Sequence, residues 1–421
     1  MSIGLIILIV TLVGGAYMAW NIGANDVANA MGTSVGSGAL TLAQAVVLAG
    51  VFEFAGAVLV GSHVTDTVRG KIIEVAMFQP TGPLGANGPM LLALGMVSAL
   101  FAAGIWLHFS TWLSLPVSTT HSIVGAIVGV GLVTLGTHGV DWGTVGNITA
   151  SWIISPILGA VIAFGTFVLI RRRILETEDP VGATRRTAPY LIFAVITLLF
   201  LSFIYKALKN VVAAPSFVLA LAMAVPIGGV GGLITRWGVH RTEPQVADPY
   251  KYVERVFGRL QVITALYVAF AHGANDVANA IGPLAAVANL ATEGFAQVAT
   301  RAPVPLWVLA LGGAGIVMGL ATYGYRVIRT VGGAITEITP TRGFSAEFGA
   351  ATTVLIASRM GLPISTTHTL VGAVIGVGFA HGMGALNFRV IRNIVNSWIA
   401  TVPAGAILAA GIFVMLRSLV I

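Results

Sequence analysis

The chain has 421 residues, of which 57% are hydrophobic and only 9% are charged, and it contains no cysteine. A soluble domain carries roughly 25% charged residues, so this composition argues against a soluble enzyme, a nucleic-acid-binding protein and a disordered chain. The net charge of +7 is then a signal of membrane topology, to be interpreted by position.

Apolar runs occur along the whole chain, and a helix needs about 20 apolar residues to span the hydrocarbon core. The strong candidates for membrane segments are Ile3–Trp20, Leu42–Gly61, Leu91–Leu107, Ile148–Ile170, Tyr190–Ile204, Val211–Ile234, Leu306–Tyr323 and Ile399–Leu416. The weaker ones, which glycine or polar residues interrupt, are Ile123–Leu135, Leu260–Phe270, Ala346–Ala357 and Leu370–Ala380. The predicted fold class is an all-α polytopic membrane protein with about twelve segments, some of them re-entrant.

Two stretches are rich in arginine and are predicted to lie in water: Arg171–Ala188 and Arg236–Arg259. Two apolar segments separate these stretches, so both are expected on the same side of the membrane. Short basic loops lie in the cytoplasm, which is where we expect both.

The sequence contains two copies of one unit. GANDVANA occupies Gly23–Ala30 and recurs at Gly273–Ala280, and LPVSTTHSIVGAIVGVG at Leu115–Gly131 recurs as LPISTTHTLVGAVIGVG at Leu362–Gly378. The order and the spacing of the motifs are kept, which indicates a duplication. The predicted organisation is a first repeat at 1–170, a linker with basic loops and two membrane segments at 171–258, and a second repeat at 259–421.

The positions of the charges indicate that the two copies are inverted. The first copy ends in the basic loop at Arg171 and the second begins near Arg259, both on the predicted inner side. The loop before the last segment carries Asp141 and no basic residue in the first copy, but Arg389 and Arg392 in the second. Both termini are therefore expected outside. Inverted repeats with broken helices are typical of secondary transporters, and the 52 glycines fit close helix packing.

Each GANDVANA motif carries an Asn-Asp pair and a second Asn three residues later: Asn25, Asp26 and Asn29, and Asn275, Asp276 and Asn279. An ionised Asp at membrane depth needs a partner, and no Lys or Arg lies near either Asp in sequence. Carboxylate, amide and freed backbone carbonyl oxygens suit Na⁺, or the Asp carries a proton. The alternative is an Asp that caps a helix near the membrane surface.

Each copy of the second motif has a Ser-Thr-Thr triplet after a proline and before a glycine-rich apolar stretch: Ser118, Thr119 and Thr120, and Ser365, Thr366 and Thr367. This pattern predicts a helix N-terminus, where free N–H groups and hydroxyls favour an anion. Two such ends across a pseudo-twofold axis would surround a tetrahedral oxyanion. The alternative is plain helix capping with hydroxyl bonds between helices.

Several further titratable residues lie in apolar segments. Glu53 and Glu347 are candidates for function because acids inside a membrane are costly, and the alternative is a Glu that is satisfied within the bundle or lies at the interface. His121 and His368 follow the triplets and would orient hydroxyls, relay protons or only bond the backbone. His272 has an isoleucine as its counterpart in the first copy, which sets it apart from the symmetric core.

The duplicated GANDVANA and P-[VI]-S-T-T-H motifs resemble the inorganic phosphate transporter (PiT) family, and the resemblance covers both halves of the chain. It implies an inverted-repeat secondary transporter, not an enzyme, that imports orthophosphate with Na⁺ in some members and H⁺ in others. It also implies that the Asn-Asp pairs are ion and phosphate ligands, that the triplets cradle phosphate, and that Glu53 and Glu347 match acidic positions of the family. The long soluble central loop of larger eukaryotic relatives is missing.

The sequence therefore predicts a multi-pass cell-membrane symporter of inorganic phosphate that works by alternating access. Its expected partners are the lipid bilayer, phosphate and a coupling cation, and no nucleic acid. We expect Na⁺ as the coupling cation, with H⁺ as the alternative. The sequence leaves open whether the protein forms a homodimer. The predicted phosphate ligands are Asn25, Ser118, Thr119, Thr120, Asn275, Ser365, Thr366 and Thr367. The predicted cation ligands are Asp26, Asn29, Glu53, Asp276, Asn279 and Glu347.

Two rival functions belong to other classes. An anion channel with a Ser/Thr-lined filter is the first, and two buried Asp residues that repel a permeating anion argue against it. A non-transporting phosphate receptor is the second, and the short loops argue against it. An ATP-driven pump is set aside because the sequence has no GxxxxGK[ST] loop.

Overall fold

The computed structural model describes residues 2–61, 72–207, 215–242, 248–292, 294–295, 298, 304–359 and 364–421. Residues 211–214 of one predicted segment, 243–247 of the second basic stretch and 362–363 of the second triplet motif lie outside them.

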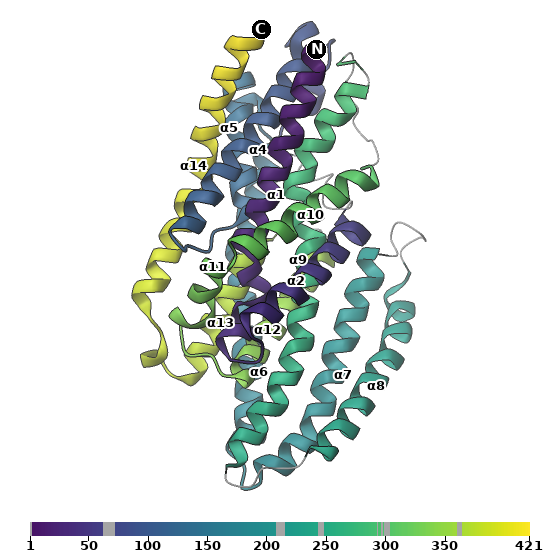
Figure 1. The fold of residues 1–421 in the computed structure, drawn as a ribbon, viewed down its shortest axis with the longest axis vertical. Coiled ribbons are helices and arrows are strands. Elements are labelled where there is room, and N and C mark those ends of the chain that lie inside the picture. Colours follow the sequence, from purple (N-terminus) through teal and green to yellow (C-terminus); the bar gives the residue numbers. More distant parts are fainter. Residues whose placement is uncertain are drawn as a thin grey trace.

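The α-helices are α1 (Ile3–Gly36), α2 (Leu42–Val60), α4 (Gly88–Trp112), α5 (Thr119–Leu135), α6 (Trp142–Ile170), α7 (Pro180–Ala207), α8 (Phe217–Arg241), α9 (Pro249–Thr292), α10 (Leu306–Thr322), α11 (Tyr325–Arg329), α12 (Pro340–Arg359), α13 (Thr366–His381) and α14 (Phe388–Val420). The predicted all-α membrane fold is confirmed, and the helices form an elongated bundle (Figure 1).

Fewer helices of the described residues are long enough to cross a membrane than the about twelve segments, some of them re-entrant, that the sequence predicts. Among the described residues, nine helices are long and apolar enough to cross a bilayer, or ten if the bent pair formed by α10 and the segment Tyr325–Ala334 is one span. The helix α13 has 16 residues and is too short to cross, since a span needs about 20. The prediction of about twelve segments is therefore not confirmed.

Both GANDVANA motifs lie inside continuous helices. The helix α1 runs through the first motif from Ile3 to Gly36, and α9 runs through the second from Pro249 to Thr292. Backbone carbonyls within a helix accept bonds from the following turn, so the first motif has no freed carbonyl of the kind that we expected as a cation ligand. In the second motif Pro283 has no N–H group to donate, which frees the carbonyl of Asn279 from its helical bond. The helix breaks lie elsewhere, at the 60° bend after α10 and at the loop between α4 and α5.

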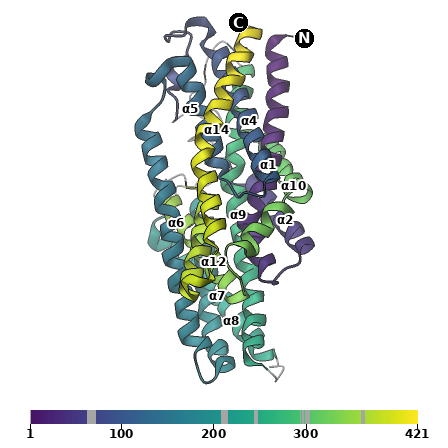
Figure 2. The same cartoon turned by 90° about the vertical axis from the view of Figure 1, so that its left-hand side faces the viewer.

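The two copies run in opposite directions. In Figure 1, α1 descends from the N-terminus at the top while α9 rises from the bottom, and both chain ends lie at the top. Figure 2 shows the same opposition between α6 and α14. The copies also interlock, because α1 packs on α10 as α9 packs on α2, and α5 packs on α14 as α13 packs on α6.

The arginine-rich stretches are more helical than predicted. The helix α6 continues through a π-helical turn to Leu175, and α7 already begins at Pro180. The helix α8 extends to Arg241 and α9 begins at Pro249. The basic residues therefore lie mostly on helix ends, all at the end of the bundle opposite the two chain termini (Figure 1).

The first glycine of each GANDVANA motif is a crossing point between helices. A Cβ on Gly23 would collide with the backbone carbonyl of Ile316 in α10, and a Cβ on Gly273 would collide with the backbone carbonyl of Glu53 in α2. Only glycine allows the two backbones to approach this closely. The glycines thus fix where α1 and α9 cross their neighbours, and with that the position of the Asp residues that follow.

We expect Gly23→Ala and Gly273→Ala each to destabilise the protein by about 1–3 kcal/mol, because the added methyl group meets backbone that cannot move aside. Gly165→Ala is the control, since a Cβ at this exposed position in α6 meets nothing within 4 Å. Thermal unfolding of the detergent-solubilised variants measures the effect. Melting temperatures at both motif glycines equal to that of the control would contradict the close crossing.

Candidate functional site

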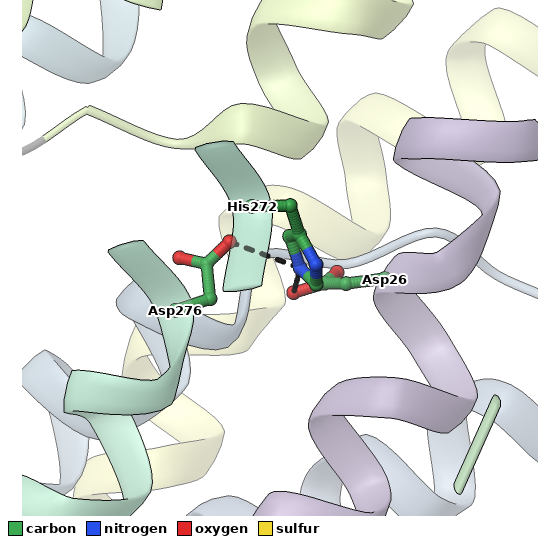
Figure 3. Close-up of side chains that lie close together, drawn as sticks. All are labelled: Asp26, His272 and Asp276. Carbon is green, nitrogen blue, oxygen red and sulfur yellow. Dashed lines mark ion pairs between the residues drawn. The ribbon is translucent and has the colours of Figure 1, made fainter. Parts of the chain in front are cut away.

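The two motif Asp residues meet at a histidine in the middle of the bundle. The Nε2 atom of His272 lies 3.0 Å from Asp276 Oδ2, one turn along α9, and 3.5 Å from Asp26 Oδ2 on α1. Figure 3 shows the imidazole between the two carboxylates, and all three side chains are buried. The crossing of α1 and α9 therefore brings together two acids that are 250 residues apart in sequence.

Glu53 of α2 completes this cluster from the other edge of the imidazole. Its Oε1 atom lies 3.3 Å from His272 Nδ1, and both side chains are fully buried. Three carboxylates thus converge on one imidazole, which carries at most one positive charge. With all three carboxylates ionised the cluster is short of positive charge, and either a bound cation or bound protons would make up that deficit.

The cluster also has oxygen atoms suited to a hard cation. Asn29 Oδ1 and Glu53 Oε2 are buried and have no hydrogen-bond partner among the described residues. The atoms of Asp26, His272 and Asp276 that face each other lie within 4.8 Å of one another, a spacing that fits one ion. The carboxylate and amide oxygens of the cluster suit Na⁺, whereas the imidazole nitrogen of His272 does not.

Sequence analysis set His272 apart from the symmetric core because its counterpart is Ile22, and therefore did not name it as a site residue. His272 is the group that contacts Glu53 and both motif Asp residues. The Asp residues therefore have a partner in the protein itself, although neither has a Lys or Arg near it in sequence. A signal was present in the sequence, since His272 precedes Asp276 by four residues and shares its face of the helix.

Each copy's Asn-Asp motif contacts the other copy's Thr-Thr pair. Asn29 Nδ2 donates to Thr367 Oγ1 at 2.8 Å, and the Thr367 hydroxyl donates to Asp26 Oδ1 at 3.2 Å. On the other side, Asn279 Nδ2 lies 3.2 Å from Thr119 Oγ1 and 3.3 Å from Thr120 Oγ1. This exchange between repeats is what the pseudo-twofold axis predicts.

Within its own copy, Asp276 has a further hydroxyl partner. The Thr366 hydroxyl donates to Asp276 Oδ2 at 3.0 Å, and Asn279 Nδ2 lies 3.4 Å from the other carboxylate oxygen. All four triplet threonines are buried. The Thr-Thr pairs, the amides and the Asp carboxylates therefore form one continuous polar cluster.

The serines of the triplets cap helices. Ser118 Oγ accepts from the backbone N–H of His121, and Ser365 Oγ accepts from that of His368, both at 3.2 Å. The helices α5 and α13 begin directly after them. The first N–H groups of a helix have no acceptor inside the helix, so both N-termini present donors and a positive dipole end beside the Asp residues.

Asn25 and Asn275 differ although the motif around them is identical. Asn25 Nδ2 donates to Thr111 Oγ1 and to the Leu115 carbonyl, and its Oδ1 accepts from the Val117 N–H. Asn25 thereby holds the loop that leads into α5. Asn275 Nδ2 donates to the neighbouring Asp276 Oδ1 at 3.1 Å.

We expect Asn25→Ala to lower thermal stability by about 1–3 kcal/mol, because it leaves the buried N–H of Val117 without its acceptor. Asn275→Ala is a control from the equivalent position and should cost less, since the one hydrogen bond of its amide within the described residues goes to another side chain instead of a backbone group. Unfolding of both variants, followed by intrinsic tryptophan fluorescence, makes the comparison. Equal losses would show that Asn25 does not stabilise the loop.

Glu347 lies in a separate nest of donors. Its Oε1 atom accepts from the hydroxyls of Thr33 and Ser34 at 2.6 and 2.8 Å and from Gln261 Nε2 at 3.1 Å. Its Oε2 accepts from Thr264. These four donors satisfy the carboxylate within the protein. In the described part of the chain no hydrogen bond or ion pair joins Glu347 to Asp26 or Asp276. That matches the alternative stated for it above.

The two triplet histidines form a stack with two tryptophans behind the helix N-termini. The rings of His121 and Trp152 are 3.5 Å apart between centroids, those of His368 and Trp398 are 3.7 Å apart, and the two imidazoles are 4.2 Å apart. The Trp398 indole N–H donates to the Pro116 carbonyl in the other repeat. The stack therefore fastens the two triplets to one another.

Comparison with known proteins identifies the chain. The sequence profile of the phosphate transporter family matches residues 22–409. The chain belongs to this family. Among curated members of the phosphate transporter family, a protein of Pyrococcus abyssi assigned as a phosphate permease is 50% identical over 409 residues, which cover 97% of this chain and 98% of the relative. The inorganic phosphate transporter 2-1, chloroplastic, of Arabidopsis thaliana is 45% identical, over 95% of this chain and 70% of its own.

A solved structure of the phosphate transporter family has the same fold. It is described as the sodium-dependent phosphate transporter, is 42% identical to this chain and superposes with a TM-score of 0.89. The match covers 99% of this chain and 100% of the other. The resemblance drawn from the motifs is confirmed, and the chain is a transporter of this family, not an enzyme.

Proposed function

We propose that this chain imports inorganic phosphate together with Na⁺ across the cell membrane by alternating access. The observation that carries the proposal is the meeting of two opposed helix N-termini, those of α5 and α13, with the Asp26–His272–Asp276 cluster. A helix N-terminus attracts an anion, and a carboxylate cluster attracts a cation. The sodium-dependent phosphate transporter of the same fold supports Na⁺ as the coupling ion.

In this proposal the two ligands depend on each other for electrostatic reasons. Phosphate beside ionised Asp26 and Asp276 would be repelled, and Na⁺ at the carboxylates offsets that repulsion. Bound Na⁺ therefore strengthens the binding of phosphate, and bound phosphate strengthens the binding of Na⁺. This mutual dependence is the basis of coupling.

The residues divide between the two ligands. The triplet threonines and the caps Ser118 and Ser365 would donate to phosphate, with Asn25 and Asn275 beside them. The Na⁺ ligands would be Asp26, Asn29, Glu53, Asp276, Asn279 and Glu347. Glu347 is the weakest of the proposed Na⁺ ligands because its oxygens already accept four bonds from side chains.

Uptake of ³²P-phosphate into proteoliposomes tests this function. With a Na⁺ gradient imposed and the proton gradient collapsed, we expect phosphate to accumulate above its outside concentration. Accumulation driven only by a proton gradient would replace Na⁺ by H⁺ in the proposal. Equilibration without accumulation under either gradient would favour the anion channel.

We also propose the repeat boundaries and sidedness expected from the sequence, with repeats at 1–170 and 259–421, a linker at 171–258, and the basic helix ends in the cytoplasm. Tags at the two termini should react with an impermeant reagent applied outside intact cells. A tag between α6 and α7 should react only after the cells are opened. Reaction of the terminal tags from the cytoplasmic side would reverse this topology.

A further inference from the structure

The linker helices α7 and α8 line a cavity, open on one side, that the transport cluster does not use. The two helices lie side by side at the edge of the bundle (Figure 1). The cavity between them has a volume of about 510 Å³. It is lined by Arg185, Arg186, Pro189, Tyr190, Phe193, Gly229, Gly232, Leu233, Arg236 and His240. Its wall combines basic groups with apolar and aromatic ones.

The basic groups of this cavity lack acidic partners. No carboxylate of the described residues lines the cavity, and Arg186 and Arg236 make no ion pair within that part of the chain. Arg185 is held in place, since its guanidinium donates to the Tyr252 hydroxyl and to the Thr242 carbonyl. Three arginines thus face a shared space with a fixed surplus of positive charge. Such a space attracts an anion.

The cavity lies at the level where the protein surface changes from basic to apolar. Tyr190 and Trp237 are 75% and 60% exposed, and the guanidinium of Arg241 stacks 3.9 Å above the Trp237 ring. Exposed Tyr and Trp residues gather at the headgroup level of a bilayer. Toward the N-terminus of α8 the exposed side chains, among them Leu219 and Val230, are apolar and would face the hydrocarbon.

We propose that this cavity binds an anionic phospholipid, with the lipid phosphate on the arginines and an acyl chain along the apolar face of α8. Arginine pairs with phosphate oxygens through two parallel N–H bonds, which adds geometric specificity to the attraction between the charges. Basic pockets between membrane helices on the cytoplasmic side recognise lipid headgroups in the same way. The site lies at the end of the bundle that we assign to the cytoplasm.

The glycines of α8 supply a variant that closes the cavity without disturbing the helix packing. A Cβ at Gly231 or Gly232 would meet α7, whereas a Cβ at Gly229 meets nothing within 4 Å and Gly229 lines the cavity. Gly229→Leu should therefore fill the lipid site while α7 and α8 stay together. Gly238→Leu is the matched control, because Gly238 lies on the same helix, is equally unobstructed and is not part of the lining.

Native mass spectrometry of the full chain tests the proposal after purification from vesicles of equal parts phosphatidylcholine and phosphatidylglycerol. We expect phosphatidylglycerol to remain bound to the wild type in preference to phosphatidylcholine. The double variant Arg186→Gln/Arg236→Gln should retain roughly ten- to thirtyfold less, at about 1 kcal/mol per basic residue. Gly229→Leu should lose the lipid, whereas Gly238→Leu and Arg241→Gln should keep it.

A second arm separates a lipid phosphate from free phosphate. Inorganic phosphate added before ionisation should leave the bound phosphatidylglycerol in place. Displacement of the lipid by phosphate would assign the cavity to the free anion instead.

Equal retention of phosphatidylglycerol by the double variant and by Arg241→Gln would reduce the effect to general surface charge and overturn the site. Circular dichroism and size-exclusion profiles identify any variant that loses lipid only because it unfolds.

Discussion

Asp26→Asn and Asp276→Asn should each flatten the dependence of phosphate uptake on Na⁺ concentration and lower the apparent Na⁺ affinity roughly ten- to a hundredfold. That range corresponds to about 1.5–3 kcal/mol for a lost contact with a charged group. Asn keeps an oxygen that can accept the bonds from Asn29 and Thr367, so the helices should remain packed. What changes is the charge, which leaves the cluster with less attraction for a cation.

The control for this experiment is Asp141→Asn at the start of α6. The bonds that Asp141 accepts from the backbone N–H and hydroxyl of Thr144 hold the pKa of this exposed carboxyl below its usual range, so the control also removes an ionised carboxylate. Asn is an equally good helix cap, and uptake should stay at the wild-type level. Uptake measured against Na⁺ concentration, and separately against pH, compares all three variants. Wild-type curves for both cluster variants would remove these Asp residues from the mechanism.

His272→Ile, which copies the residue at the equivalent position 22, should have the second large effect. The change leaves Asp26, Asp276 and Glu53 buried without their shared imidazole. Removing one partner of a buried charged group costs about 3–5 kcal/mol. We therefore expect a marked fall in melting temperature and a loss of concentrative uptake.

Sodium should distinguish this electrostatic defect from a defect of shape. If the carboxylates of the variant lack positive charge, replacing choline chloride by sodium chloride should raise the melting temperature of His272→Ile more than that of the wild type. His108→Ala is the control, because His108 contacts Tyr17 and Trp20 outside the cluster. An equal response to sodium in all three proteins would mean that His272 only fills space.

The comparison of the two copies explains why the cluster is not symmetric although the motifs are. The Asp, Asn and Thr residues recur in both repeats and exchange contacts across the axis. His272 and Glu53 have no equivalent in the other repeat, and their side chains contact each other. In the proposed function, phosphate would bind to donors that are nearly the same in both repeats. The cation would bind at an asymmetric site, because Glu53 and His272 have no equivalents in the other repeat.

The sequence by itself determined the membrane class, the duplication and the family. These properties depend on composition and on repeated motifs, which are visible along the chain without any knowledge of packing. The inversion also followed, because basic residues mark one side of a membrane. The polar residues of the site were identifiable for a similar reason: Asp26, Asp276 and the triplets are costly in apolar segments unless they are used.

Only the tertiary structure decided what each of these residues contacts. His272 was recognisable as central only when α1 and α2 were placed against α9, since its partners Asp26 and Glu53 lie far from it in sequence. Identical motifs gave Asn25 and Asn275 different partners, because a hydrogen bond depends on the neighbouring element and not on the local pattern. Glu347 was likewise satisfied by donors from α1 and α9 that no sequence period relates to it. Periodicity and propensity describe one helix at a time, whereas a buried charge is stabilised or left unpaired by the helices packed around it.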